Sequence, residues 1–407
     1  MALRHYRFGF ATLLLVSLSA VVFWWSRAVE AHHPRADFAP PLSYYEARAA
    51  VAQAQARETQ ARTALHQPLG AINPDLLPQM QTIYFAQTGH HLSNRSGFLD
   101  FWRTNGQVQI FGYPLTEEII EDGRIVQYFE RARFELHAAQ IGTPQQVQLG
   151  RLGHEVLAWQ GLPPRIDDPQ TGGRYFPETG HTLWGKFRSF WERRDGMQLY
   201  GLPLSEVVEE DGRSIQYFER AKFVYFPEEL PGVFRSLQNA YGYSLNGLYE
   251  VQLGDLGRLV AEQRGLRLDA VSQLEGTLAW HPAIWARRVE VSLSAQWLSA
   301  YEGDLLVFRA PVATGRDGFN TPVGDFAIYY RTPMQTMSGC MGGECWDVPH
   351  VPWAQYIVGG VALHGTYWHN SHGTGVRPSH GCINLRIEDA QWLYEWADVG
   401  TPVTVRY

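Results

Sequence analysis

A cysteine and two histidines near the C-terminus have the residue types and the spacing of a site for nucleophilic catalysis. His364 is separated by fourteen residues from the segment 379–384, which reads Ser-His-Gly-Cys-Ile-Asn. A cysteine attacks as its thiolate, and a nearby imidazole lowers the pKa of the thiol. The glycine that precedes Cys382 suits a tight turn, and backbone N–H groups there can stabilise a developing oxyanion. The segment therefore predicts attack by Cys382 on a carbonyl carbon.

The elements that must position this site are predicted to be mostly strands. Alternating apolar residues and turn residues predict strands at 287–293, 297–301, 305–308 and 326–330, loops at 313–315 and 321–324, and a helix at 387–397. Residues 286–407 are thus predicted to form a predominantly antiparallel β catalytic domain with one helix after the nucleophile. Because that helix follows Cys382, its N-terminal partial positive charge is expected to favour the thiolate.

The other two cysteines lie close together, at Cys340 and Cys345, so Cys382 is the unpaired third cysteine if they form a disulfide. A short disulfide would shape a glycine-rich lid near the cleft. Two free thiols are an alternative. A zinc site formed by these cysteines with Glu344 and His350 is a further alternative. We do not adopt it, because zinc would need a fourth ligand and either a reducing environment or tightly bound thiolates. No metal site is predicted.

Several motifs together resemble one known family. Besides His364 and the segment 379–384, the sequence contains Ala-Thr-Gly at 313–315, Thr-Pro-x-Gly-x-Phe at 321–326, and Gly-Thr-Pro-Val at 400–403. This combination resembles the L,D-transpeptidase (YkuD-type) catalytic domain, and the resemblance covers about residues 286–407. It does not extend to the rest of the chain.

The resemblance implies roles for particular residues. Cys382 would be the nucleophile and His364 the general base and then the acid, with the backbone carbonyl of Gly365 orienting the imidazole. The remaining implied roles are the oxyanion hole (the amides of Gly381 and Cys382), pocket shaping (Ser379 and His380) and substrate binding (Asn384 and, through a substrate carboxylate, Arg386).

The resemblance also implies a reaction on peptidoglycan. Cys382 would attack a tetrapeptide stem, expel its terminal D-residue and pass the acyl group from a thioester to the amine of a second stem. Water as acceptor would give an L,D-carboxypeptidase, and an idle domain would leave a non-catalytic cell-wall-binding protein. Carbapenem-type β-lactams are the expected covalent inhibitors, and no cofactor is inferred.

The middle of the chain is a duplication. Residues 80–160 and 170–260 share Thr-Gly-His, Phe-Trp, Asp-Gly and a Gln-Tyr-Phe-Glu-Arg-Ala segment, and both end in Val-Gln-Leu-Gly-x-Leu-Gly. Each Asp-Gly predicts a hairpin turn, and each Phe-Trp a short helix. Two small α+β or β-rich repeats are therefore predicted. They resemble modules of bacterial envelope enzymes, and their aromatic residues could form a core or bind glycan.

The N-terminal part reads as a targeting segment and a spacer. Arg4 and Arg7 precede an uncharged run at 8–25, so residues 1–31 are predicted to be a signal peptide or a signal anchor. The following residues 32–79 are predicted to be a helical spacer, and 261–285 a linker. The protein is accordingly expected on the outer face of the bacterial membrane or in the cell wall, anchored or secreted.

Composition limits the alternatives. The 407 residues predict about three domains, and a hydrophobic content of 45% excludes wholesale disorder. With 34 Lys and Arg against 41 Asp and Glu, the net charge is −7, which disfavours a nucleic-acid partner. The overall prediction is a multidomain α+β protein.

Overall fold

A computed structural model describes residues 66–68, 81–161, 172–226 and 250–407. The predicted targeting segment 1–31 lies outside this range. Of the predicted helical spacer 32–79, the structure describes only residues 66–68, which form strand β1 (His66–Pro68). This strand pairs with a strand of the first repeat, and the rest of the spacer lies outside the described residues. Among the described residues, no helix combines the length and the apolar character needed to cross a bilayer.

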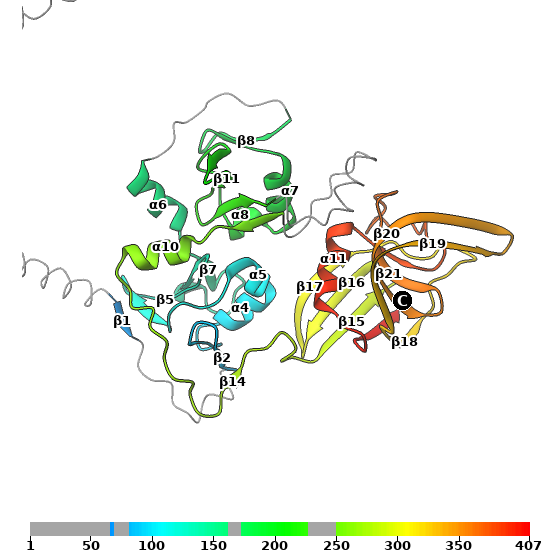
Figure 1. Ribbon diagram of the computed structural model, residues 1–407, viewed down its shortest axis with the longest axis horizontal. Helices are drawn as coiled ribbons and strands as arrows, with labels where there is room; N and C mark the ends of the chain where they lie inside the picture. The colour runs from blue at the N-terminus through cyan, green and yellow to red at the C-terminus, as the bar shows by residue number, and fades with distance from the viewer. Residues whose placement is uncertain (1–65, 69–80, 162–171, 227–249) are drawn as a thin grey trace, which may run out of the picture. The chain divides into compact units, whose positions relative to one another are not determined.

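The C-terminal domain contains a mixed five-stranded sheet (Figure 1). Its order is β17 (Leu305–Pro311), β16 (Trp297–Glu302), β15 (Arg287–Ser292), β23 (Pro402–Arg406) and β18 (Gly324–Ala327). All neighbours are antiparallel except β15 and β23, which run parallel. Strand β23 thus lies inside the sheet, between β15, the first strand of the domain, and the edge strand β18.

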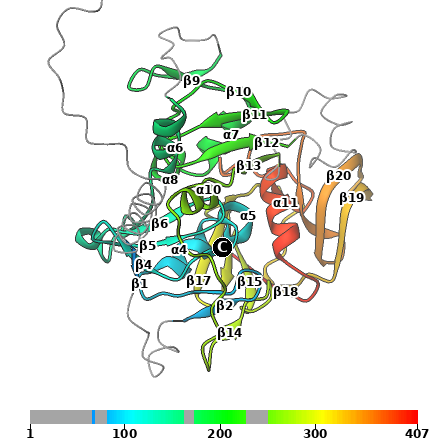
Figure 2. The same ribbon diagram turned by 60° about the vertical axis from the view of Figure 1, so that its left-hand side comes forward.

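A second sheet carries the candidate nucleophile. Its order is β19 (Tyr330–Met341), β20 (Glu344–Val358), β21 (Val361–Gly365) and β22 (Ile383–Leu385). Helix α11 (Ile387–Trp396) follows and packs on β20 and β21 (Figure 2). Both sheets and the helix contribute to one hydrophobic core. The prediction of a β-rich domain is confirmed.

The sequence prediction of a single strand at 326–330 is wrong. Strand β18 ends at Ala327, and the chain then crosses to the other sheet, where β19 begins at Tyr330. Buried Ile328 donates its N–H to Thr401 at this crossing. An apolar run that joins two strands cannot be distinguished from one strand by its pattern alone. The long hairpin of β19 and β20 that follows was not predicted either; it turns at Gly342-Gly343, both with positive φ.

The two repeats have the same order of strands and α-helices, and the first also contains the short 3-10 helix η2 (Ala138–Gln140), whose counterpart would lie outside the described residues. In the first these are β2 (Ile83–Phe85), β3 (His90–Leu92), α4 (Phe98–Thr104), α5 (Gln107–Phe111), β4 (Ile119–Glu121), β5 (Arg124–Tyr128), β6 (Arg133–Leu136), η2 (Ala138–Gln140), β7 (Val147–Leu149) and α6 (Leu152–Gln160). In the second they are β8 (Arg174–Phe176), β9 (His181–Leu183), α7 (Gly185–Arg193), α8 (Gly196–Leu199), β10 (Val208–Glu210), β11 (Arg213–Tyr217), β12 (Lys222–Tyr225), β13 (Val251–Leu253) and α10 (Leu256–Gln263). The predicted Asp-Gly turns join β4 to β5 and β10 to β11.

Each repeat docks its last helix on the other copy. The N–H of Gly153, in α6, donates to Glu219 of the second repeat at 3.1 Å, and the N–H of Arg258, in α10, donates to Glu130 of the first at 2.9 Å. A Cβ at Gly153 would lie 1.8 Å from the carbonyl oxygen of Phe218, and one at Gly257 would lie 1.9 Å from that of Phe129. The copies also share two hydrophobic cores. They therefore form one folded body with shared cores.

Gly153→Ala is expected to destabilise this body strongly. The added methyl group must push α6 away from the second repeat, which also weakens the hydrogen bond to Glu219, and such overpacking costs about 3 kcal/mol. Gly142→Ala is the matched control, since it has open space and only the backbone cost of a positive φ, about 1 kcal/mol. Chemical unfolding followed by tryptophan fluorescence compares the two, and equal losses would contradict the exchange of helices.

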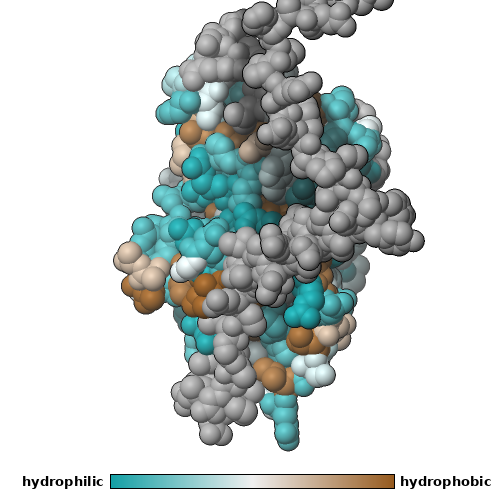
Figure 3. All heavy atoms as spheres, turned by 90° about the vertical axis from the view of Figure 1, so that its left-hand side faces the viewer, coloured by the Kyte–Doolittle hydropathy of each residue, from teal (hydrophilic) through white to brown (hydrophobic). Residues whose placement is uncertain are grey.

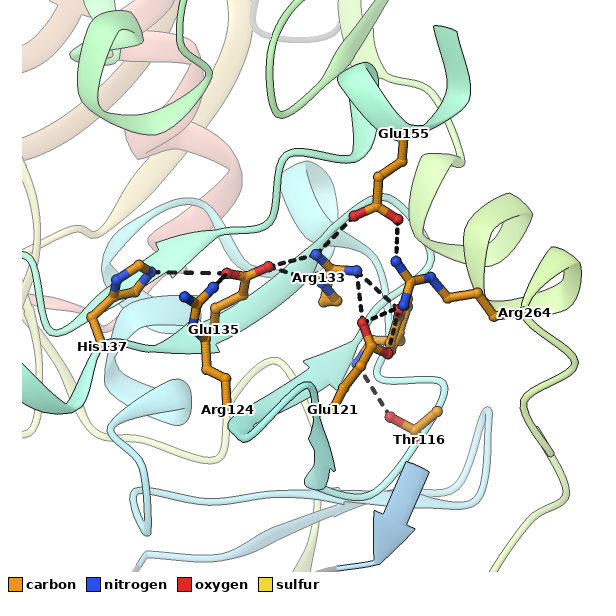
Figure 4. A network of polar contacts seen from close by, with 9 residues as sticks. Thr116, Glu121, Arg124, Arg133, Glu135, His137, Glu155 and Arg264 are labelled. Carbon is orange, nitrogen blue, oxygen red and sulfur yellow. Dashed lines mark hydrogen bonds and ion pairs between the residues drawn. The ribbon is translucent and has the colours of Figure 1, made fainter. Parts of the chain in front are cut away.

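A buried charge network reinforces the contact between the repeats (Figure 4). Arg133 binds Glu121 at 3.0 Å, Glu135 at 2.6 Å and Glu155 at 2.9 Å. Arg264, just after α10, binds Glu121 at 2.7 Å and Glu155 at 2.6 Å. Buried charges of this kind are tolerated only when they are paired, so the second repeat supplies the cation that balances the acids of the first.

The aromatic residues of the repeats form the core rather than a sugar-binding face. Phe85, Trp102, Phe134, Phe218 and Phe223 are fully buried. On the face shown in Figure 3, hydrophilic residues predominate among the described residues, and hydrophobic ones gather in small patches. Of the two readings of these repeated rings, core packing is the one that the structure bears out.

Residues 261–285, predicted to be a linker, pack along the first repeat. Strand β14 (Leu278–Ala279) pairs in parallel with β2, and Trp280 stacks on Phe85 with ring centroids 5.5 Å apart. The N–H of Trp280 donates to Tyr84 at 2.7 Å. This segment is therefore an ordered strap on the repeat and not a free connection.

A buried ion pair joins the first repeat to the C-terminal domain. Arg103 donates from Nε to Glu302 at 3.2 Å, and these side chains are only 4% and 1% exposed. Gln107 and Trp396 donate to the same carboxylate. Because removal of one member of a buried pair leaves an uncompensated charge, the two regions depend on each other for stability.

Candidate active site

The parallel pairing of β21 and β22 brings His364 and Cys382 together. Leu363 lies opposite Ile383, and His364 opposite Asn384. Cys382 immediately precedes β22, one step back along this register, so it lies alongside Ala362. Because side chains alternate between the faces of a sheet, His364 and Cys382 project from the same face of adjacent strands.

The same register adds Tyr356, which the sequence reasoning missed. Tyr356 pairs with Ala362 across β20 and β21, so Tyr356, Ala362 and Cys382 form one row across three strands. The small side chain of Ala362 leaves the tyrosine and the thiol near each other. The pKa of Tyr356 is raised by burial and also by the negative charge that Cys382 would carry. No local sequence signal could have identified this residue, since it lies 26 positions before Cys382 on another strand.

The imidazole of His364 is buried, and its tautomer is determined by its neighbour. Nδ1 lies 3.0 Å from the carbonyl oxygen of Gly365. A carbonyl can only accept a hydrogen bond, so Nδ1 carries the proton and Nε2 is left as an acceptor. Trp368 stacks on the ring at a centroid distance of 5.9 Å. Burial lowers the pKa of His364 to about 4, against the opposing effect of the Gly365 carbonyl.

The thiol of Cys382 is not activated in the way that the sequence suggested. Burial raises its pKa, and a hydrogen bond from the Ala362 backbone opposes this only in part. Helix α11 begins at Ile387, after the intervening strand β22, and the field of a helix terminus falls off within about one turn. The expected thiolate is therefore replaced by a neutral thiol beside a neutral imidazole at neutral pH.

Ser379 braces the turn that carries the nucleophile. Its Oγ donates to the carbonyl of Cys382 at 2.6 Å and accepts the N–H of Gly381 at 3.2 Å. Of the two amides expected to form an oxyanion hole, that of Gly381 is thus engaged within the loop. Gly381 itself has a φ of 116°, which favours glycine.

The two upstream motifs hold this turn from the other side. Thr321 donates from Oγ1 to the carbonyl of Gly381 at 2.9 Å, and the same oxygen accepts the N–H of Gly315 at 2.9 Å. The backbones of Arg316 and Thr314 also bond Ser379. The motifs 313–315 and 321–326 therefore act by fixing the backbone around Cys382.

His380 receives contacts from the tip of the β19–β20 hairpin. Its Nε2 lies 3.0 Å from Glu344, and its ring stacks on Trp346 at 4.3 Å between centroids. Glu344 also pairs with Arg316. Cys340 and Cys345 are joined by a disulfide across the turn that contains Glu344. The pairing removes both thiols as zinc ligands, and the hairpin tip rests against the residue that precedes Gly381.

The remaining predicted residues lie at different distances from the nucleophile. Asn384 is buried, its side-chain amide lies 2.9 Å from Nε2 of His369, and it exchanges backbone hydrogen bonds with Ala313. Arg386 binds Asp389 at 2.6 Å at the start of α11. Asn384 thus orders the loop between the histidine and the cysteine, and Arg386 faces its own helix.

The C-terminal region is similar to known proteins. Residues 286–405 match the family model of the YkuD L,D-transpeptidase catalytic domain. The C-terminal region is a YkuD-type domain. A Mycobacterium tuberculosis relative named as L,D-transpeptidase 3 is 32% identical over 102 residues, which are 24% of this chain and 38% of the relative. A Bacillus licheniformis relative named as L,D-transpeptidase YkuD is 31% identical over 118 residues, which are 29% of this chain and 64% of the relative.

Matches to solved structures cover a comparable share of the chain. The catalytic domain of an E. faecium L,D-transpeptidase is 26% identical, with a TM-score of 0.28, and the match covers 30% of this chain and 99% of that one. The chain thus spans between about a third and two thirds of the length of the two curated relatives. The YkuD-type match does not include the repeats.

Proposed function

We propose that this protein is an L,D-transpeptidase that cross-links peptidoglycan through a thioester on Cys382. The observation that carries the proposal is the placement of His364 and Cys382 on one face of two adjacent strands, within the YkuD-type domain. The substrate class comes from the family, and the thioester chemistry from the thiol and the imidazole.

The proposed first half-reaction begins from two neutral groups. As the Cys382 sulfur attacks the carbonyl carbon of the tetrapeptide stem, the thiol proton passes to Nε2 of His364. The C–S bond forms, the C–N bond breaks, and the imidazolium returns its proton to the amine of the departing D-residue. The hydrogen bond from Nδ1 to Gly365 keeps Nε2 available for both transfers.

The oxyanion needs donors that are not already used. Since the Gly381 amide is engaged by Ser379, we assign this role to the amide of Cys382 and the hydroxyl of Tyr356. In the second half-reaction, the side-chain amine of another stem attacks the thioester, loses a proton to His364 and restores the thiol.

Water in place of the amine gives the carboxypeptidase alternative with the same residues. Incubation with a disaccharide tetrapeptide separates the two, because transfer to an amine yields a cross-linked dimer and transfer to water yields a tripeptide. We expect dimers as the main product by mass spectrometry. Tripeptide alone, with acceptor stems in excess, would favour the carboxypeptidase.

β-Lactams are proposed to acylate the same thiol. Other L,D-transpeptidases are described in complex with imipenem and as acylated by ertapenem. The strained lactam carbonyl offers Cys382 an acyl donor whose leaving nitrogen stays attached, so the adduct persists. Acylation is therefore a convenient readout of the first half-reaction.

The low pKa of His364 predicts that the acylation rate falls only at an unusually low pH. Its neutral form, which accepts the thiol proton, dominates above about pH 4. At pH 5 such a group is about 90% neutral, whereas an ordinary histidine is about 3% neutral. The acylation rate should stay flat from pH 7 to about 5 and fall below about 4.5. The pKa of His372 is also lowered to about 4, but His372→Gln should leave this pH profile unchanged. A fall of the wild-type rate near pH 6.5 would contradict the assignment of His364 as the base.

The hairpin tip is expected to modulate the reaction modestly. Glu344→Gln removes the charge that binds His380 and Arg316, and should slow acylation about fivefold. Replacement of both Cys340 and Cys345 by serine should give a similar loss, because the tip is then less constrained. Asp347→Asn, an exposed acid on the same hairpin, is the control and should leave the rate unchanged. Equal rates in all variants would exclude this role.

The location outside the cytoplasmic membrane remains part of the proposal. It rests on the sequence pattern of residues 1–31, and fractionation of cells that express the full chain with a C-terminal tag tests it. A signal in the envelope fraction would support export, and a cytosolic signal would contradict it.

A further inference from the structure

A cavity of about 510 Å³ lies where both repeats meet the C-terminal domain. Helices α4 and α5 of the first repeat and α7 and α8 of the second contribute to its wall, together with β17 and α11. Its volume is within the range of small-molecule sites. It is distinct from the Cys382 site, since neither Cys382 nor His364 lines it.

The lining of this cavity is rich in arginine, although the chain is acidic overall. The lining arginines are Arg103, Arg193, Arg194, Arg287, Arg309 and Arg386, and the lining acids are Asp195, Glu388, Asp389 and Glu395. Four of the arginines are balanced by carboxylates. Arg103 binds Glu302 and Arg386 binds Asp389, while Arg193 lies 3.8 Å from Glu388 and Arg287 lies 3.5 Å from Asp398.

Two of the arginines lack such a partner. Within the described residues, neither Arg194 nor Arg309 has a carboxylate within ion-pair distance, and each guanidinium lies over an aromatic ring instead, that of Phe190 for Arg194 and that of Trp297 for Arg309. Burial lowers the pKa of Arg194, which means that its charge is poorly solvated. A guanidinium in such a place is stabilised by an anion that supplies the missing acceptors.

Other groups of the wall point to the same kind of ligand. The indole N–H of Trp280 and the Nε of Arg287 are buried without an acceptor. Burial also raises the pKa of Asp389 to about 6 and that of Glu395 to about 7, so near neutral pH these two acids offset the arginines less than ordinary carboxylates would. The cavity wall therefore has hydrogen-bond donors without acceptors, and these suit a negatively charged ligand.

We propose that this cavity binds a small anion bearing several carboxylate or phosphate groups, with Arg194 and Arg309 as its main contacts. Planar guanidinium groups bind both kinds of oxyanion through paired hydrogen bonds. The ligand would touch parts of both repeats and the start of α11, which directly follows the strand after Cys382. The site is independent of the proposed reaction and stands even if that reaction is wrong.

Calorimetric titration of the full chain in 0.15 M salt tests the proposal. The probes are citrate, which carries three carboxylates and is not a substrate of the proposed reaction, inorganic pyrophosphate, and neutral chitobiose as a control. Preference for citrate would identify a carboxylate ligand, and preference for pyrophosphate a phosphate ligand; either supports the anion site. Absence of binding by both anions would overturn it.

Variants locate the binding. Arg194→Gln and Arg309→Gln should each weaken the affinity for the binding anion about tenfold, whereas Arg267→Gln, which removes an exposed positive charge outside the cavity, should change it less than twofold. Arg309 is exposed at the domain surface, so its variant is expected to fold even if that of Arg194 does not. An equal affinity in Arg309→Gln and Arg267→Gln would refute the assignment.

Discussion

Replacement of Cys382 by serine is expected to reduce both β-lactam acylation and tetrapeptide turnover by about 10⁴-fold or more. A hydroxyl is a much weaker acid than a thiol, and the base that must accept its proton is itself weak, since burial lowers the pKa of His364 to about 4. The pair is therefore suited to a thiol only. Rates of acylation by a carbapenem, followed by the loss of lactam absorbance, give the measurement.

The control for this variant is a measurement of its thermal stability. Serine and cysteine differ little in volume, and Cys382 is only partly buried at the surface, so the thermal midpoint should shift by no more than a few degrees. A serine variant that retains a tenth or more of the wild-type rate would show that another group is the nucleophile.

Replacement of His364 by glutamine is expected to slow acylation by about 10³-fold. Glutamine can still donate to the Gly365 carbonyl, so the strand pairing is retained, but no base then accepts the thiol proton. The reaction must instead proceed through the small fraction of thiolate. Because burial raises the pKa of Cys382, the rate of the variant should increase about tenfold per pH unit above pH 7.

That pH slope distinguishes catalysis from structure. A merely structural histidine would leave the variant with the flat profile of the wild type at a lower amplitude. A rate equal to that of the wild type at pH 7 would remove His364 from the mechanism.

The candidate nucleophile could be found from the sequence because its signal is local. Cys382 stands in a short segment of distinctive composition, and His364 precedes that segment at a fixed spacing. The state of the two groups could not be inferred in the same way, because it depends on burial. Burial shifts both pKa values toward the neutral forms, whereas the motif alone suggested a thiolate.

Residues that reach the site from distant strands were invisible to sequence reasoning. Tyr356 depends on the register between β20 and β21, and Glu344 on the length of a hairpin whose strands alternate too weakly to be predicted. The brace formed by Ser379 follows from a turn geometry that composition does not specify.

The organisation of the repeats could be predicted only where it depends on local sequence patterns. Their duplication, their turns and their short helices follow from local patterns. The exchange of terminal helices through Gly153 and Gly257, and the buried pair of Arg103 with Glu302, join positions far apart in the chain. These contacts make the repeats a structural part of the protein, and we expect deletion of residues 80–260 to destabilise the C-terminal domain.

The most direct test of the central claim is the mass of the intact protein after incubation with a carbapenem, followed by peptide mapping. We expect one added equivalent of the lactam, located on the peptide that contains Cys382, and no addition to the Cys382→Ser variant. An unmodified wild-type mass under native conditions, or an adduct on any other residue, would contradict it.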